Sequence, residues 1–253
     1  MLCSIFPSRC HFKIETDAGS FLLLAGQFDR AFKALHDSFD QGKANAKSPL
    51  FGREERLEDQ LVEDCKSLGM AESIRDFLQE PFSEWMDELA DESSGGDDSS
   101  PECRLSRNGA GALAIAMQQT MAVRDALLVS IIVDERRSSR DFLMGFMANP
   151  TLPGNTRHLE ESLNGSFRDA SRKPDTKRCD NGVNMMFDII GMVPERYHVQ
   201  PLAIISYVLW WMGDERAMLC AMRALALDEN CSLAAIICSA AHRHIGPAWA
   251  EET

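Results

Sequence analysis

The segment from Leu202 to Ala241 constrains the fold more than any other stretch, because three apolar runs at helical spacing follow one another with short turns between them. Gly213 comes after the first run, where a glycine can adopt the left-handed conformation that ends a helix without a Cβ clash. Asp214 follows it and is expected to cap the next helix. The segment therefore predicts a helical hairpin with a third helix packed on it.

The second of these predicted helices carries a stripe of small side chains. Ala217, Ala221 and Ala224 recur at spacings of four and three residues, which places them on one helical face. Small residues on such a face allow a neighbouring helix to approach closely. We therefore expect Gly213, Asp214 and the three alanines to serve turn formation and helix packing.

Three stretches of the chain resemble domain-of-unknown-function family 4192, which is widespread in actinobacteria. They are GDERAMLCAMRALALDENCSLA (213–234), VRDALLVSIIVD (123–134) and SPLFGREERLEDQL (48–61). The resemblance runs from Ser48 to Trp249 and implies a helical C-terminal portion. Members of that family carry a longer N-terminal α/β portion, so this chain has room for at most a short N-terminal β remnant. No activity is established for the family, and the resemblance implies no catalytic residues.

The C-terminal helix pair also resembles half of a tetratricopeptide unit. Ala217, Ala224 and Asp228 fit the spacing of that unit, whereas Glu229 stands where the unit has a proline. A tandem array needs consecutive units, and the chain shows only one further weak echo, near Gly26. The predicted fold class is mainly α, with helical hairpins and a TPR-like C-terminal helix pair.

The pattern of apolar residues predicts further helices over residues 21–39, 52–68, 105–132 and 138–147. A helix that starts near Ala71 is expected to be kinked or interrupted at Pro81, which lacks the backbone N–H. The polar and basic residues 167–180 are predicted to form a loop.

The net charge of −13 belongs to one region of the chain. Residues 53–103 contain 17 Asp/Glu and 4 Lys/Arg, and the remaining residues contain 22 of each sign. Within that region the stretch DESSGGDDSSP (91–101) is too polar to bury apolar surface, and is either a solvated spacer or a partner-binding loop. We predict an N-terminal helical region over 1–90, an acidic flexible linker over 91–104 and a C-terminal helical domain over 105–253.

Cysteine usage and hydropathy predict a cytoplasmic protein that does not enter a membrane. The eight cysteines include no C-x-x-C pair, and charged residues interrupt the apolar N-terminus where a secretory signal would lie. The longest weakly polar run is about half of the roughly 20 residues that a membrane-spanning helix needs.

No phosphate-binding loop, dinucleotide-binding glycine motif, nucleophile elbow or zinc-protease motif occurs, so no catalytic residue, cofactor or metal is predicted. One charge pair stands out. Arg124 and Asp125 lie inside an otherwise apolar helical block, where ions are rarely buried without partners. The pair is either a structural tie between helices or part of a dispersed active site, for which no companion acid or nucleophile is visible.

Three functions remain open at this point. The first is a non-enzymatic helical module that binds a protein or peptide, and the second is an enzyme with a dispersed site near Arg124 and Asp125. The third, binding of nucleic acid, is not expected, because the protein is acidic and its two arginine clusters contain few aromatic residues. These clusters comprise Arg168, Arg172, Lys173, Lys177 and Arg178, and Arg136, Arg137 and Arg140. The oligomeric state is not predicted.

Overall fold

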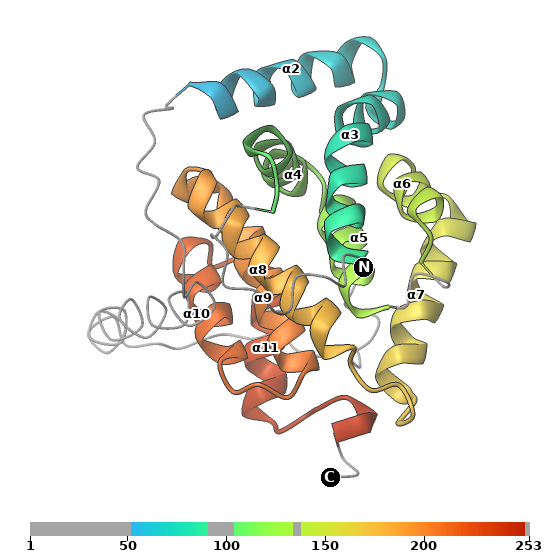
Figure 1. Ribbon diagram of the computed structural model, residues 1–253, viewed down its shortest axis with the longest axis vertical. Coiled ribbons are helices and arrows are strands. Elements are labelled where there is room, and N and C mark those ends of the chain that lie inside the picture. The colour runs from blue at the N-terminus through green and yellow to red at the C-terminus, as the bar shows by residue number, and fades with distance from the viewer. Residues whose placement is uncertain (1–51, 91–103, 134–137, 251–253) are drawn as a thin grey trace.

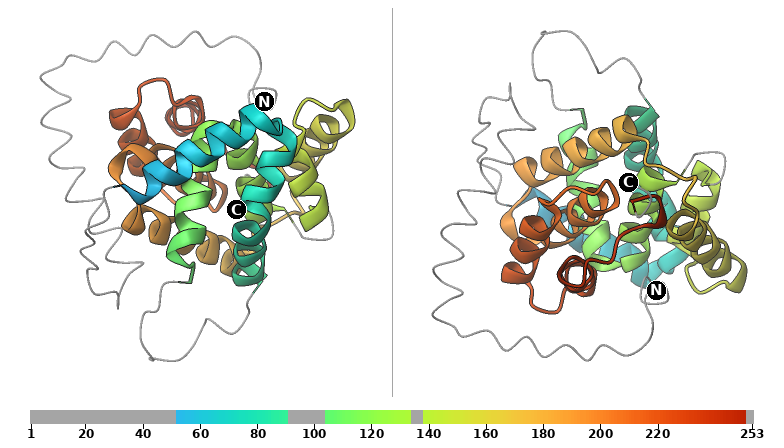
Figure 2. Two further views of the ribbon diagram at one scale, coloured as in Figure 1. Left: turned by 90° about the horizontal axis from the view of Figure 1, so that it is seen from above. Right: turned by 90° about the horizontal axis from the view of Figure 1, so that it is seen from below.

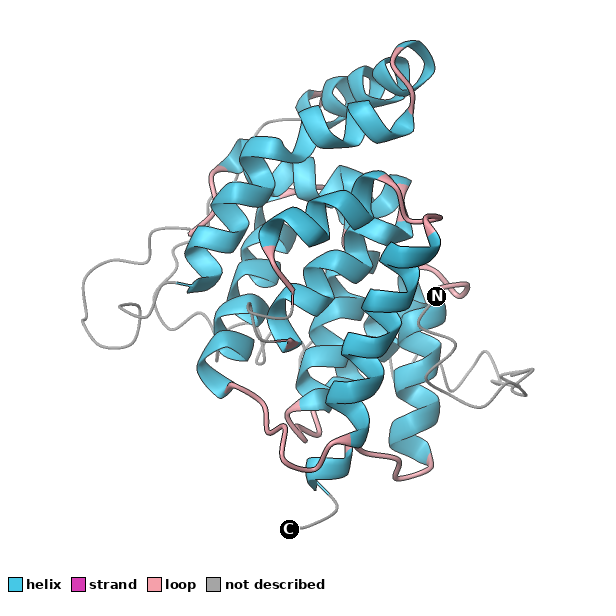
Figure 3. Ribbon diagram, turned by 90° about the vertical axis from the view of Figure 1, so that its right-hand side faces the viewer, coloured by secondary structure: helices cyan, strands magenta, loops and turns pink. Residues whose placement is uncertain are grey.

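A computed structural model describes residues 52–90, 104–133 and 138–250. In these residues it contains α-helices and two short 3₁₀ helices but no strand, which confirms the mainly α fold class (Figures 1 and 3). The predicted helix over 21–39 and the possible β remnant lie outside the described residues. The elements are α2 (Arg53–Ser67), α3 (Met70–Ala90), α4 (Arg107–Gln119), α5 (Met121–Ile132), α6 (Arg140–Ala148), α7 (Pro153–Arg168), α8 (Thr176–Met192), η2 (Glu195–Tyr197), α9 (Val199–Trp211), α10 (Ala217–Leu227), α11 (Ser232–His242) and η3 (Ala248–Ala250).

Helix α9 forms the centre of the fold. Every residue from Gln200 to Trp211 is buried. A helix that is apolar on all sides has to lie inside a protein, because no face of it is suited to water. Helices α4, α5, α8, α10 and α11 pack around it. Helix α2 lies across the end of this bundle, and α6 and α7 lie along one side of it (Figure 1).

The turn from α9 to α10 forms at the predicted glycine. Gly213 has a φ of 77°, a left-handed conformation that its lack of a Cβ permits. Helix α10 packs against α9 and α11, and Ala217, Ala221 and Ala224 are all buried. The expected role of Asp214 as N-cap of α10 is wrong: the helix begins two residues later, after Arg216. Asp214 instead accepts the backbone N–H of Arg216 at 2.9 Å and pairs with its guanidinium.

The N-terminal helices share the hydrophobic core of the rest of the described chain. Helix α3 packs against α4, α6 and α8, and α2 packs against α3 and α4. The indole of Trp85 in α3 donates to Ser130 Oγ in α5 at 2.9 Å, in a buried position. One core therefore crosses the predicted boundary at 91–104. Residues 91–103 themselves lie outside the described part of the chain.

Two details of the sequence-based helix assignment are wrong. The block 105–132 forms two helices, because Thr120 is extended with a φ of −144° and its side chain accepts the N–H of Ala122. Helix α3 contains Pro81 within its span, so of the two outcomes expected there, a kink or an interruption, the interruption does not occur. Only residues 169–175 form a loop where 167–180 was predicted, because α7 extends to Arg168 and α8 begins at Thr176.

None of the described helices combines the length and the apolar character that a membrane crossing requires.

Candidate functional site

The Arg124–Asp125 pair predicted from the sequence lies in the core, on α5. Asp125 Oδ1 accepts hydrogen bonds from Arg124 Nη2 at 2.6 Å and from Arg124 Nε at 2.9 Å. The two side chains are only 4% and 2% exposed. Arg124 Nη1 lies 3.5 Å from Gln200 Oε1 at the start of α9, so the pair links these two helices. This geometry suits a structural ion pair.

Two titratable groups in the described part of the chain interact with the pair, the Tyr207 hydroxyl and the Cys231 thiol. Burial, together with the charge of Asp125, raises the pKa of the Tyr207 hydroxyl, and burial raises the pKa of the Cys231 thiol. Both groups therefore hold their protons firmly at neutral pH. A substrate has no route to carboxylate oxygens that are sealed in this way, so an active site at Arg124 and Asp125 gains no support.

The two arginine clusters do not form a common basic surface in the described residues. Arg140 reaches back to α3, where it binds Asp87 and donates to Ser83 Oγ at 2.6 Å. Arg178 Nε donates to the backbone carbonyl of Ser130 at 2.8 Å. Arg136 and Arg137 lie outside the described residues. Arg140 and Arg178 are thus directed to different internal partners, whereas Arg168, Lys173 and Lys177 are exposed.

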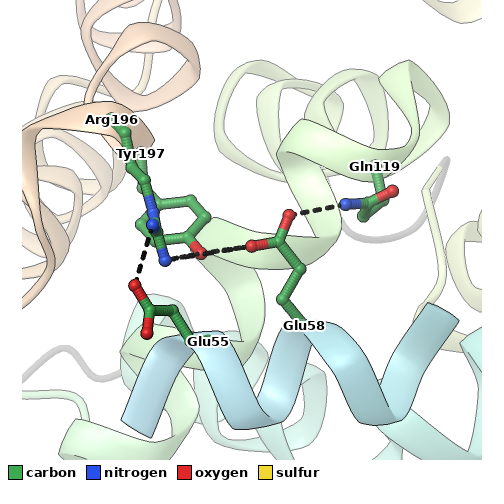
Figure 4. Close-up of polar contacts among 5 residues, drawn as sticks. All are labelled: Glu55, Glu58, Gln119, Arg196 and Tyr197. Atoms are coloured by element: carbon green, nitrogen blue, oxygen red, sulfur yellow. Dashed lines mark hydrogen bonds and ion pairs between the residues drawn. The ribbon is translucent and has the colours of Figure 1, made fainter. Parts of the chain in front are cut away.

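A polar cluster that the sequence did not reveal joins α2 to the bundle (Figure 4). The Tyr197 hydroxyl donates to Glu58 Oε2 at 2.6 Å, and Gln119 Nε2 donates to Glu58 Oε1 at 2.9 Å. Arg196 lies over the Tyr197 ring and pairs with Glu55 at 3.2 Å. Burial and the hydrogen bond to Glu58 raise the pKa of Tyr197 to about 12, so the hydroxyl remains a donor. Each of these side chains has a hydrogen-bond or ion-pair partner within the cluster, so the cluster links α2 to α4 and η2 and has a structural role.

The described surface is hollowed along α7. One hollow of about 610 Å³ lies between α6 and α7, and an adjoining hollow of about 600 Å³ lies over the C-terminal half of α7. The first is lined by Ser139, Phe142, Gly154, Asn155, His158, Glu161, Ser162 and Arg172. The second is lined by Glu161, Asn164, Gly165, Arg168, Asp169, Ala170 and Arg172. Because Glu161 and Arg172 line both, we treat the two hollows as one surface feature, the α7 groove.

The groove follows one face of α7. Gly154, His158, Glu161, Gly165 and Arg168 recur at spacings of three and four, the period of a helix face. The α6–α7 pair lies at the edge of the molecule in two perpendicular directions of view (Figures 1 and 2). Helix α7 contacts α5, α6 and η3, while Gly154, His158, Glu161 and Arg168 on the groove face are exposed.

The wall of the groove on the α6 side is aromatic. The ring of Phe142 meets the imidazole of His158 edge-on, with centroids 4.4 Å apart and an interplanar angle of 72°. Phe142 is half-buried and His158 is exposed. This end of the groove offers an apolar surface next to polar atoms, a combination that is common in binding sites.

Arg172 is positioned by the turn that follows α7. Asp169 Oδ1 accepts the N–H of Ser171 at 3.1 Å and its hydroxyl at 2.6 Å, and Asp169 Oδ2 lies 3.0 Å from Arg172 Nε. These hydrogen bonds from Ser171, with the charge of Arg172, lower the pKa of the Asp169 carboxyl. The guanidinium lies over Gly165, where an added Cβ would come within 2.7 Å of Nη1. A side chain at position 165 would therefore make the guanidinium shift away from α7.

The terminal nitrogens of Arg172 remain available. Its side chain is 31% exposed, and its one ion pair is the contact of Nε with Asp169. Nη1 and Nη2 have no hydrogen-bond or ion-pair partner among the described residues. A guanidinium carries five donors in a planar arrangement that matches a carboxylate or phosphate. The groove therefore contains a held cation with unused donors.

Sequence reasoning missed this site for a definite reason. It assigned Arg172 to a solvated basic loop, because residues 167–180 lack apolar residues at helical spacing. The only available signal was the D-x-S-R turn at 169–172, which places a capping carboxylate just before an arginine. The described residues also contain no group of three His, Cys, Asp or Glu side chains that could hold a metal.

Comparisons of the chain with protein-family models, with curated proteins and with solved structures give no match. The resemblance to family 4192 therefore stays a prediction.

Proposed function

We propose that this protein is a non-enzymatic helical interaction module that binds a segment of a partner protein in the α7 groove. The observation that carries the proposal is the pair of adjoining hollows along one exposed helix face. The charge pair that raised the enzyme alternative is buried in the core, and Arg140 and Arg178 of the two arginine clusters bind internal partners. Among the described residues, neither alternative has a comparable hollow in its favour.

The size of the groove fits a short peptide. From Gly154 to Arg168 the helix rises by roughly 21 Å at about 1.5 Å per residue. An extended chain rises about 3.3 Å per residue, so about six residues would span that length. Together the hollows exceed the volume of many small-molecule sites, yet they are shallow and follow a helix, as grooves for protein segments do.

The proposal also includes three expectations from the sequence: a TPR-like helix pair, a cytoplasmic location and membership of family 4192. The packing of α10 on α9 and α11 around the Gly213 turn supports a TPR-like helix pair. A reducing cytoplasmic location is supported by the five described cysteines, Cys65, Cys179, Cys220, Cys231 and Cys238, which are all free thiols. Membership of family 4192, with its actinobacterial distribution, remains part of the proposal.

The test is affinity capture with a blocked groove. Gly154 lines the groove, and an added Cβ meets no atom within 4 Å, so Gly154→Leu introduces a bulky side chain at the groove from a backbone position with room for a Cβ. We expect the full-length wild-type chain to retain a partner that purified protein then binds directly, and the variant to bind it at least about tenfold more weakly. A loss of about 1.4 kcal/mol of binding free energy corresponds to that factor.

Gly191→Leu is the matched control. Gly191 also lies in a helix, on α8, is exposed, has no atom within 4 Å of an added Cβ, and does not line the groove. It should bind the partner as the wild type does. Equal binding by Gly154→Leu and the wild type would show that the groove is not the binding surface.

A further inference from the structure

We infer that Arg172 anchors a carboxylate of the segment bound in the α7 groove, so that the groove selects acidic peptides. This inference rests on the proposed function and specifies the chemistry of its ligand. It rests on one geometrical fact: Arg172 is fixed at the junction of the two hollows while its two terminal nitrogens have no partner in the described residues.

The fixed position of Arg172 makes it a suitable anchor. A free arginine side chain loses much rotamer freedom when it binds a ligand. Here the ion pair with Asp169 at 3.0 Å and the close approach to Gly165 have already restricted the side chain. The ligand therefore gains the bidentate contact without the full entropic cost. Nη1 and Nη2 can donate two parallel hydrogen bonds to the two oxygens of one carboxylate.

The other charges of the groove favour a peptide over a nucleic acid. Glu161 and Asp169 line the same hollows as Arg172, and Glu161 is exposed. Arg168 also lines the second hollow, so the groove holds two cations and two carboxylates. A phosphodiester chain presents a negative charge at every nucleotide and would meet both carboxylates, whereas a peptide can place a single carboxylate on Arg172. Binding of nucleic acid also draws on several cations at once.

The groove further specifies where the carboxylate stands in the peptide. The aromatic wall at His158 and the glycine beneath Arg172, Gly165, are about 10 Å apart along α7 at about 1.5 Å per residue. This distance corresponds to about three residues of a peptide in the polyproline II conformation, which rises about 3.1 Å per residue and whose three residues per turn place positions i and i+3 on the same side. The preferred ligand thus carries an acidic residue about three positions from a large apolar residue, which packs on Phe142.

The test uses defined hexapeptides with the full-length protein. The probe is a fluorescein-labelled, amidated peptide that carries one Glu and one Phe three positions apart, among Ser and Gly residues. A second, otherwise identical labelled peptide has Gln in place of Glu. We expect the Glu peptide to bind roughly tenfold to a hundredfold more tightly in fluorescence anisotropy, the range for a hydrogen bond to a charged group. The difference should shrink as salt is raised.

Variants of Arg172 assign the selectivity to this residue. Arg172→Gln should bind the Glu and Gln peptides equally, and Arg172→Lys should keep part of the preference, because lysine keeps the charge but not the planar pair of donors. Arg172→Glu should prefer a peptide with Lys at that position, an inversion that a merely structural role would not produce. Arg243→Gln, which removes an exposed arginine after α11, is the charge-matched control and should leave the preference intact. Circular dichroism of each variant checks that the fold is retained.

The outcomes separate this inference from the proposed function. If Gly154→Leu abolishes peptide binding but Arg172→Gln keeps the preference for Glu, the groove is a binding site and the inference about Arg172 is wrong. If Gly154→Leu has no effect on any peptide or partner, the proposed site itself is wrong. Binding of a labelled single-stranded oligonucleotide that requires Arg172, with no binding of the acidic peptide, would also overturn the inference.

Discussion

The core around α5 and α9 and the outer face of α7 contain the same chemical pair in opposite settings. In each, an arginine lies against a nearby carboxylate of its own segment: Arg124 with Asp125, and Arg172 with Asp169. The first pair is 4% and 2% exposed, and Nε, Nη1 and Nη2 of its arginine all have polar neighbours. The second is 31% and 43% exposed and engages only Nε. A sealed pair with satisfied donors serves the fold, whereas an open pair with unused donors is available to a ligand.

The largest effect that this contrast predicts follows from breaking the sealed pair. Asp125→Asn leaves the Arg124 charge buried without its counterion, and desolvation of an unpaired ion is costly. We expect the free energy of unfolding to fall by about 3–5 kcal/mol. Urea denaturation at neutral pH, followed by circular dichroism, measures it.

Two controls sharpen this prediction. Asp169→Asn breaks the open pair and should change the stability little, because the two side chains are 31% and 43% exposed and a partly exposed ion pair contributes little. The double variant Arg124→Leu with Asp125→Leu removes both charges and should recover much of the loss. If Asp125→Asn cost no more than Asp169→Asn, the two regions would not differ in the way described.

The second effect concerns how tightly the core is packed. Gly182 on α8 faces Ile131 on α5, and an added Cβ would lie 2.7 to 2.9 Å from three atoms of the isoleucine side chain. Gly182→Ala therefore overpacks the contact, and we expect a loss of about 1–3 kcal/mol in the free energy of unfolding. The measurement is again urea denaturation.

A double-mutant cycle tests the cause of that loss. Combining Gly182→Ala with Ile131→Ala should cost less than the sum of the two single substitutions, because the smaller side chain makes room for the added methyl group. Additive costs would mean that Ile131 is not the group that the new methyl group meets.

The same contrast explains what could be predicted from the sequence. The core helix α9 was predictable because it is an apolar run that ends at the turn residue Gly213, and α10 and α11 because their apolar residues recur at the helical period. Helix α7 was largely missed: it buries only Leu159, Ser162, Leu163 and Ser166. A peripheral helix needs few apolar residues, so its pattern is weak. The break at Thr120 was missed because apolar residues continue on both sides of it.

The candidate site was less predictable than the fold, for a related reason. Arg124 and Asp125 were noticed because charges are conspicuous in an apolar stretch, and that feature indicates burial. The α7 groove depends on Phe142, His158 and Arg172, which come from separate elements and have no distinctive spacing. Arginine at 172 becomes notable only once the turn at Asp169 and the close approach to Gly165 are known.

The smallest expected effect is a gain in stability, from a second glycine-to-alanine substitution at a position on the open side of the molecule. Gly145 lies inside α6, next to α7, and an added Cβ would meet no atom within 4 Å. Because glycine loses more backbone freedom on folding than alanine, Gly145→Ala should raise the free energy of unfolding by about 0.5–1 kcal/mol. The hydrogen bond from Asn155 Nδ2 to the Gly145 carbonyl is a main-chain contact that the substitution keeps. Since Gly145 does not line the groove, peptide binding should also be unchanged. A loss of stability as large as that of Gly182→Ala would mean that the α6 surface is as closely packed as the core. The contrast between a closely packed core and an open α6–α7 side would then be wrong for α6.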